Sequence, residues 1–147
     1  MTSGIRDRIT KMPASKIREV AEMGMGIDGV MPFWFGESDE PTPNFIKDAA
    51  KKALDLNHTF YSQNNGLPPL RQAIANYMGD LYNTSPAPNP ITARPSGMQA
   101  IMLTMQALVD YGDEVITVGP TWPNIPSSAA VLGGIPREVS LRETDGK

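Results

Sequence analysis

The chain has 147 residues, with 13 basic and 16 acidic side chains, a formal net charge of −3 and no cysteine. No long run of one charge is present, which argues against a nucleic-acid partner or a charged membrane surface, and the lack of cysteine excludes disulfides and thiolate metal sites. No apolar run approaches the roughly 20 residues that span a bilayer. We therefore expect a soluble, cytoplasmic protein without a metal, long enough for one modest hydrophobic core.

The first ninety residues predict helices joined by polar or proline-rich segments. Apolar side chains at helical spacing indicate three helices with one buried face each, at residues 14–25, from Thr42-Pro43 to about residue 54, and from Pro68-Pro69 to about residue 81. Ser15 can cap the first helix, and proline in the first turn is a common start signal for the others. Residues 1–12 form a polar arm in this interpretation, and the apolar residues 30–35 predict a short strand.

From residue 91 onward the pattern alternates between strand and helix. Short β-branched or alternating runs predict strands at residues 91–94, 115–118 and 135–141, and the segments between them have helical spacing. This alternation predicts an α/β fold with a mostly parallel sheet covered by helices. About three strands are few for an open sheet, so we expect the sequence to be a piece of a longer chain.

The turn at Ser96-Gly97 joins the first of these strands to its helix. The first N–H groups of a helix have no intrahelical acceptor and lie at the positive end of the helix dipole, so they bind anions. The next strand leads to Trp122, at the carboxyl edge where open α/β sheets place their ligands. Together they indicate a planar, phosphorylated ligand, although an ordinary turn and a core aromatic would look the same on spacing alone.

Five short motifs follow one another along the chain. They are Phe-Gly-Glu-Ser-Asp-Glu-Pro-Thr-Pro at residues 35–43, Thr-Phe-Tyr at 59–61 followed by Gly66 and by Leu-Arg at 70–71, Ser-Gly-Met-Gln-Ala at 96–100, Tyr-Gly-Asp-Glu-Val at 111–115, and Pro-Thr-Trp-Pro-Asn at 120–124. Their order and intervals resemble the N-terminal part of class I/II aminotransferases, the fold-type I enzymes that use pyridoxal 5′-phosphate (PLP). The resemblance runs from about residue 32 to residue 141.

The resemblance implies a fold and a domain organisation. The fold is three-layer α/β/α with a mostly parallel sheet, the N-terminal fragment of the fold-type I transferases. Residues 1–36 would form an arm and part of a small domain, and residues 37–147 the truncated start of the large PLP-binding domain. The full enzyme would be a homodimer, because the sites of this family lie at the subunit interface.

The resemblance also implies a PLP site. The backbone amides of Gly97, Met98 and Gln99 would hold the cofactor phosphate, and Trp122 would stack on the pyridine ring. Tyr61 would reach across the dimer interface to the phosphate in the neighbouring subunit's site.

On the substrate side, the backbone at Gly36 would approach the carboxylate of an amino acid or a 2-oxo acid. The Schiff-base lysine of the family, its pyridine-binding aspartate and its substrate-binding arginines would all lie beyond Lys147, so we expect no catalytic residue in this chain and no transamination by it alone. Two residues depart from the family pattern, Met98 in place of a small residue and Tyr111 in place of proline.

Two alternatives to an aminotransferase stay open at this point. The first is a PLP-dependent β-lyase or decarboxylase on the same fold, because the residues that separate these reactions lie downstream. The second is a non-catalytic module that binds a phosphorylated ligand or a partner chain, which the missing lysine favours. Outside the site, we expect Arg71 to be a salt-bridge partner and His58, the sole histidine, to be a loop residue.

Overall fold

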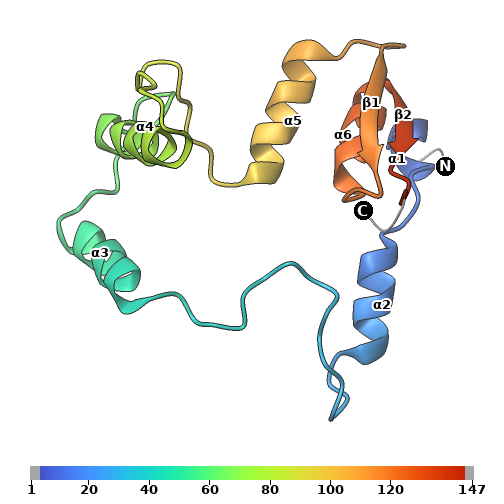
Figure 1. Cartoon of the computed structure of the whole chain (residues 1–147), viewed down its shortest axis with the longest axis horizontal. Helices are drawn as coiled ribbons and strands as arrows, with labels where there is room; N and C mark the ends of the chain where they lie inside the picture. The colour runs from blue at the N-terminus through green and yellow to red at the C-terminus, as the bar shows by residue number, and fades with distance from the viewer. Residues whose placement is uncertain (1–3, 145–147) are drawn as a thin grey trace. The chain divides into compact units, whose positions relative to one another are not determined.

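The computed structural model describes residues 4–144, which form six helices and two strands (Figure 1). In chain order these elements are α1 (Asp7–Thr10), α2 (Lys16–Gly24), α3 (Asn44–Asp55), α4 (Pro68–Tyr82), α5 (Gly97–Leu108), β1 (Glu114–Gly119), α6 (Asn124–Leu132) and β2 (Ile135–Ser140). The described residues divide into two compact units. The first unit contains residues 4–35 and 96–144, and the second is Gly36–Pro95.

A parallel strand pair with its crossover helix is the centre of the first unit. β1 and β2 pair in parallel, from Glu114 opposite Ile135 to Gly119 opposite Ser140, and α6 connects the two strands and packs on both. Parallel neighbours require such a crossover. Alternate residues of β1 are buried or exposed: Thr117 is 6% exposed, whereas Ile116 on the opposite face is 72% exposed. α6 therefore covers one face of the sheet.

Two of the predicted strands are wrong. Residues 91–94 form no ladder, and their backbone contact with a distant segment is the bond from the Ala93 N–H to the Asn65 carbonyl, 2.9 Å. Residues 30–35 fold back on α2, where the Arg18 guanidinium carbon lies 5.1 Å from the centroid of the Phe35 ring. A strand exists only beside a paired neighbour, so apolar runs without one stay as loops. The sheet of the described residues has two strands instead of three.

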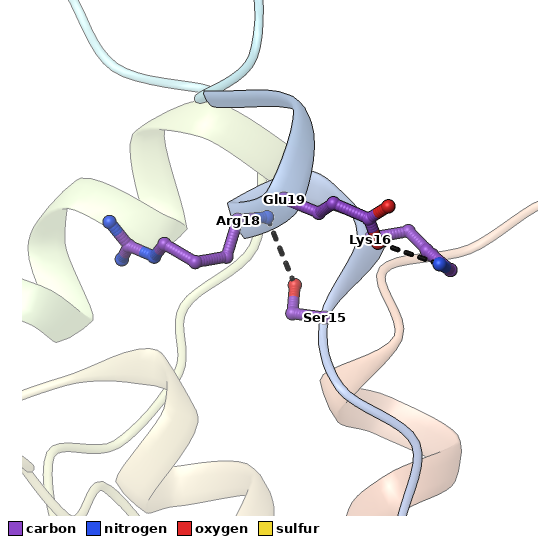
Figure 2. Close-up of polar contacts among 4 residues, drawn as sticks. All are labelled: Ser15, Lys16, Arg18 and Glu19. Carbon is purple, nitrogen blue, oxygen red and sulfur yellow. Dashed lines mark hydrogen bonds and ion pairs between the residues drawn. The ribbon is translucent and has the colours of Figure 1, made fainter. Parts of the chain in front are cut away.

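The predicted helix starts are confirmed with one exception. The Ser15 hydroxyl accepts a bond from the Arg18 N–H at 3.4 Å, and Lys16 pairs with Glu19 at 2.6 Å (Figure 2). In the same view, the Arg18 side chain extends away from this ion pair. α4 begins with Pro68 in its first turn, as expected, but α3 has Pro43 at its N-cap and no capping side chain. The hydroxyl before Pro43 therefore does not cap α3.

The hydrophobic core is smaller than predicted. The buried apolar side chains of the described residues are three alanines, Ala21, Ala75 and Ala129. α3 has an apolar stripe, but none of its residues is buried and Phe45 is 74% exposed. An amphipathic helix buries its stripe only against an opposing apolar surface, and within Gly36–Pro95 no other helix or strand packs on α3.

The predicted polar arm of residues 1–12 contains a helical turn, α1, which packs on α6. Its first three residues lie outside the described part of the chain. Among residues 4–144, no helix is long and apolar enough to cross a membrane.

Candidate functional site

The first turn of α5 contains the three predicted phosphate ligands. Ser96 is extended, with φ −153° and ψ 154°, and its hydroxyl accepts a hydrogen bond from the Gln99 N–H at 3.1 Å. Among the described residues, the N–H groups of Gly97 and Met98 donate to no acceptor. Two of the three predicted amides are therefore free, and the third is satisfied by Ser96.

The free amides of this turn are accessible. Gly97 is exposed, and a Cβ atom added to it would meet no atom within 4 Å. Open space beside two unpaired N–H groups, at the positive end of a 12-residue helix, suits an anion such as a phosphate. Met98, which follows directly, is half-buried.

Trp122 lies in the loop that follows β1. The indole side chain is 46% exposed, so it is not a core aromatic. α5 packs on α6, α6 packs on β1, and α5 and β1 run in opposite directions (Figure 1). The start of α5 and the end of β1 therefore lie towards the same end of the first unit.

Tyr61 and Gly36, the remaining predicted site residues, belong to the second unit. Tyr61 is fully exposed, at 108% of its reference area, on a loop that lines an apolar cavity of about 570 Å³ together with His58, Phe60 and Leu67. Gly36 is exposed, and no atom lies within 4 Å of the place where its Cβ would be. The structure thus brings together Gly97, Met98, Gln99 and Trp122 in one unit and places Tyr61 and Gly36 in the other.

Arg71 has a different role from the predicted salt bridge. Its Nε donates to the Ile91 carbonyl at 2.9 Å, and its Nη2 donates to the carbonyls of Pro88 and Asn89, both at 2.8 Å. It forms no ion pair with any described carboxylate. The prediction was wrong because a proline-rich segment leaves carbonyls unpaired, and a half-buried guanidinium on α4 satisfies three of them.

No lysine described by the structure has the setting of a nucleophile. All of them are exposed, and three pair with carboxylates: Lys11 with Asp7, Lys16 with Glu19, and Lys51 with Asp48. A nucleophilic amine needs a desolvated pocket or a nearby cation. The described residues also contain no group of three or more potential metal ligands.

Comparison with known proteins defines the family. The sequence model of the aminotransferase class I and II family matches residues 29–147, so the chain belongs to this family, as the motif order predicts. Enzymes of the family use PLP. The free amides of α5 and the half-exposed indole fit such a cofactor, which has an anionic phosphate and a flat ring.

Individual relatives are similar over nearly all of this chain. The aspartate aminotransferase of Pyrococcus horikoshii is 33% identical over 95% of the chain, and the probable aspartate/prephenate aminotransferase of Aquifex aeolicus is 31% identical over 99%. The chain spans 36% and 38% of the lengths of these two proteins.

Solved structures confirm the predicted fold. The Thermus thermophilus aspartate aminotransferase with maleate superimposes with a TM-score of 0.84 at 31% identity, over 94% of this chain and 37% of that one. The aspartate aminotransferase of Thermotoga maritima gives 0.81 at 30% identity, over 92% and 37%. The chain therefore has the fold of the corresponding part of a PLP-dependent aminotransferase.

Proposed function

We propose that the protein carrying this sequence is a PLP-dependent aminotransferase that transfers an amino group between an amino acid and a 2-oxo acid. The observation that supports this most is the pair of free amides at Gly97 and Met98, on the same unit as a half-exposed Trp122. Because the relatives cited above are named for aspartate, the first substrate to test is aspartate with 2-oxoglutarate.

The residues of this chain would hold and orient the cofactor. The N–H groups of Gly97 and Met98 would donate to the phosphate, and the dipole of α5 would favour its negative charge. The Ser96 hydroxyl fixes the turn by accepting from Gln99. Trp122 would cover one face of the ring, and bound PLP would supply the electron sink for chemistry at the α-carbon of the substrate.

The remaining predicted roles belong to this proposal as well. In a homodimer, the exposed Tyr61 would donate to the phosphate in the neighbouring subunit, and the backbone at Gly36 would approach the substrate carboxylate. Residues 1–36 would belong to the arm and small domain, and residues 37–147 would begin the large domain. The Schiff-base lysine would come from a part of the protein beyond residue 147.

The two alternatives are less well supported. A β-lyase or decarboxylase would have the same phosphate site. A non-catalytic module would also bind a phosphorylated ligand there, but it would catalyse no reaction. The cited relatives are named aminotransferases, which favours transfer over both. Turnover of aspartate that depends on 2-oxoglutarate would support the proposal in the whole protein. Release of ammonia without a 2-oxo acid would support a lyase, and failure to bind PLP would support the module.

Replacement of Trp122 tests the cofactor site directly. Aromatic stacking contributes about 0.5–1.5 kcal/mol, so Trp122→Ala should weaken PLP binding roughly two- to twelvefold in the whole protein, and Trp122→Phe should restore part of the loss. The control is Phe45→Ala, an aromatic on α3 that is 74% exposed. PLP release is followed by the visible absorbance of the cofactor during dialysis. Equal affinities of Trp122→Ala and Phe45→Ala, after correction for stability, would refute the stacking assignment.

A further inference from the structure

α1 is too short to form a helix without support. It has four residues, Asp7–Thr10, and its N-cap residue Arg6 makes no side-chain capping bond. Isolated helices shorter than about 12–15 residues are marginal in water. α1 nevertheless has backbone bonds such as that from the Lys11 N–H to the Asp7 carbonyl, 3.0 Å. Its packing on α6 supplies the missing stabilisation, so helix formation in the arm depends on docking.

Arg8 and Tyr111 form a side-chain contact between the docked arm and the loop before β1. The Arg8 guanidinium carbon lies 5.3 Å from the centroid of the Tyr111 ring, within the range of a cation–π interaction. Both side chains lie against Gly133, the left-handed C-cap of α6, where a Cβ would clash with the guanidinium and lie 2.7 Å from Cδ2 of Tyr111. The negative end of the α6 dipole also favours the guanidinium at this place.

The same contact explains a departure from the family pattern. Tyr111 stands where the family motif has proline, which has no aromatic face for a cation. Arg8 forms no ion pair with any described carboxylate. Among residues 4–144, the Tyr111 ring is therefore the one group that interacts with the charge of its guanidinium.

The other end of the arm lies at the opposite end of α6. Met12 and Pro13 line a cavity of about 370 Å³, and Thr121, Pro123 and Pro126 line the same cavity. Thr121 and Pro123 are the two neighbours of Trp122. Between Arg8 and Pro13 the arm thus crosses α6 from its C-cap to its first turn.

We propose that residues 7–13 form a strap across α6, held in place by the contact between Arg8 and Tyr111. Arg8 and Tyr111 are then positioning residues for the loop that carries Trp122. Opening the strap removes the wall that Met12 and Pro13 form in the cavity beside Thr121 and Pro123, and the loop that carries Trp122 loses this support. The strap follows from contacts within the first unit alone, and only its relevance to cofactor binding rests on the proposed function.

Amide hydrogen exchange tests the strap. The N–H groups of residues 9–12 are hydrogen-bonded within the arm, and they should exchange at a rate proportional to the open fraction of the strap. An exposed cation–π pair contributes about 0.5–1 kcal/mol, so Arg8→Gln and Tyr111→Ala should raise this rate roughly two- to fivefold. Two matched controls should leave it unchanged: Arg6→Gln removes a neighbouring exposed guanidinium, and Tyr111→Phe keeps the aromatic face.

A second measurement reports on the Trp122 loop. In a Trp34→Phe background Trp122 is the sole indole of the chain, and its quenching by acrylamide should increase with Arg8→Gln but not with Arg6→Gln. Unchanged exchange at residues 9–12 in both Arg8→Gln and Tyr111→Ala would overturn the proposal. An equal rise in exchange across β1 and β2 would also overturn it, because the pair would then support the whole unit. Neither readout requires PLP, so a failure of the strap and a failure of the proposed enzyme activity are distinguishable.

Discussion

Removal of the Arg71 side chain should release the proline-rich segment that precedes α5. The guanidinium donates to three carbonyls at 2.8–2.9 Å, from Pro88, Asn89 and Ile91. A hydrogen bond to a charged group contributes about 1.5–3 kcal/mol net. Arg71 is half-buried, and water can replace part of what is lost, so we expect Arg71→Ala to cost about 2–3 kcal/mol of local stability.

Exchange of two backbone amides in this segment measures the loss. The Ile91 N–H donates to the Pro88 carbonyl at 3.2 Å, and the Ala93 N–H donates to the Asn65 carbonyl at 2.9 Å. A loss of 2–3 kcal/mol corresponds to roughly 30- to 140-fold faster exchange at both. Arg71→Lys should give an intermediate rate, because an ammonium lacks the planar fork that reaches three carbonyls.

Arg94→Ala is the matched control for this experiment. Arg94 is exposed, and its Nη1 makes one long bond of 3.4 Å to the Asn64 carbonyl. Its removal should change the exchange of Ile91 and Ala93 by less than about threefold, because a weak exposed bond contributes little. If Arg71→Ala were no more effective than Arg94→Ala, the three carbonyl bonds would not hold this segment and the reasoning would be refuted.

Two further predictions concern the ends of α5 and α6. Ser96→Ala should cost about 1 kcal/mol and speed exchange of the Gln99 N–H, while Ser96→Asp keeps the acceptor; equal rates in the two variants would show that the cap does not operate. Gly133→Ala should lower the free energy of unfolding by about 1–2 kcal/mol in chemical denaturation, because φ is 100° and the Cβ would clash with Arg8. Gly97→Ala, with open space at its Cβ position, should leave that free energy within about 0.5 kcal/mol of the parent, and a comparable loss in both alanine variants would contradict the distinction.

Local signals in the sequence predicted the helices well. Ser15 and Ser96 each cap a helix through a bond to the N–H three residues on, and Pro68 begins α4. These features depend on a few consecutive residues, so they need no knowledge of the rest of the fold. The free amides at the start of α5 follow from the same local rules, which is why they could be predicted, and phosphate binding by them stays a prediction.

Features that depend on distant partners could not be predicted in this way. Residues 91–94 have strand-like composition but no neighbouring strand, and the stripe of α3 has no surface opposite it within its unit. Arg71 donates to carbonyls that lie 17 to 20 residues away in the sequence, and no periodic pattern of residues predicts these bonds. The cation–π pair of Arg8 and Tyr111 likewise joins residues about a hundred positions apart. Each outcome depends on which segment lies opposite, and spacing along the chain does not determine that.

α6 is the element on which all parts of the candidate site in the first unit depend. α5 packs on it, β1 and β2 lie under it, and the arm crosses it, so the positions of Gly97 and Trp122 are both fixed through this one helix. None of its residues is exposed: Ala129 is fully buried, and the buried Ser128 hydroxyl donates to the Asn124 carbonyl at 2.7 Å. Because α6 is covered by α5, the two strands and α1, a change in any of these contacts also affects the others. It follows that nearby residues determine the free amides of Gly97 and Met98 and the position of Trp122 after its strand. The packing around α6 determines how the amides and the indole lie relative to each other.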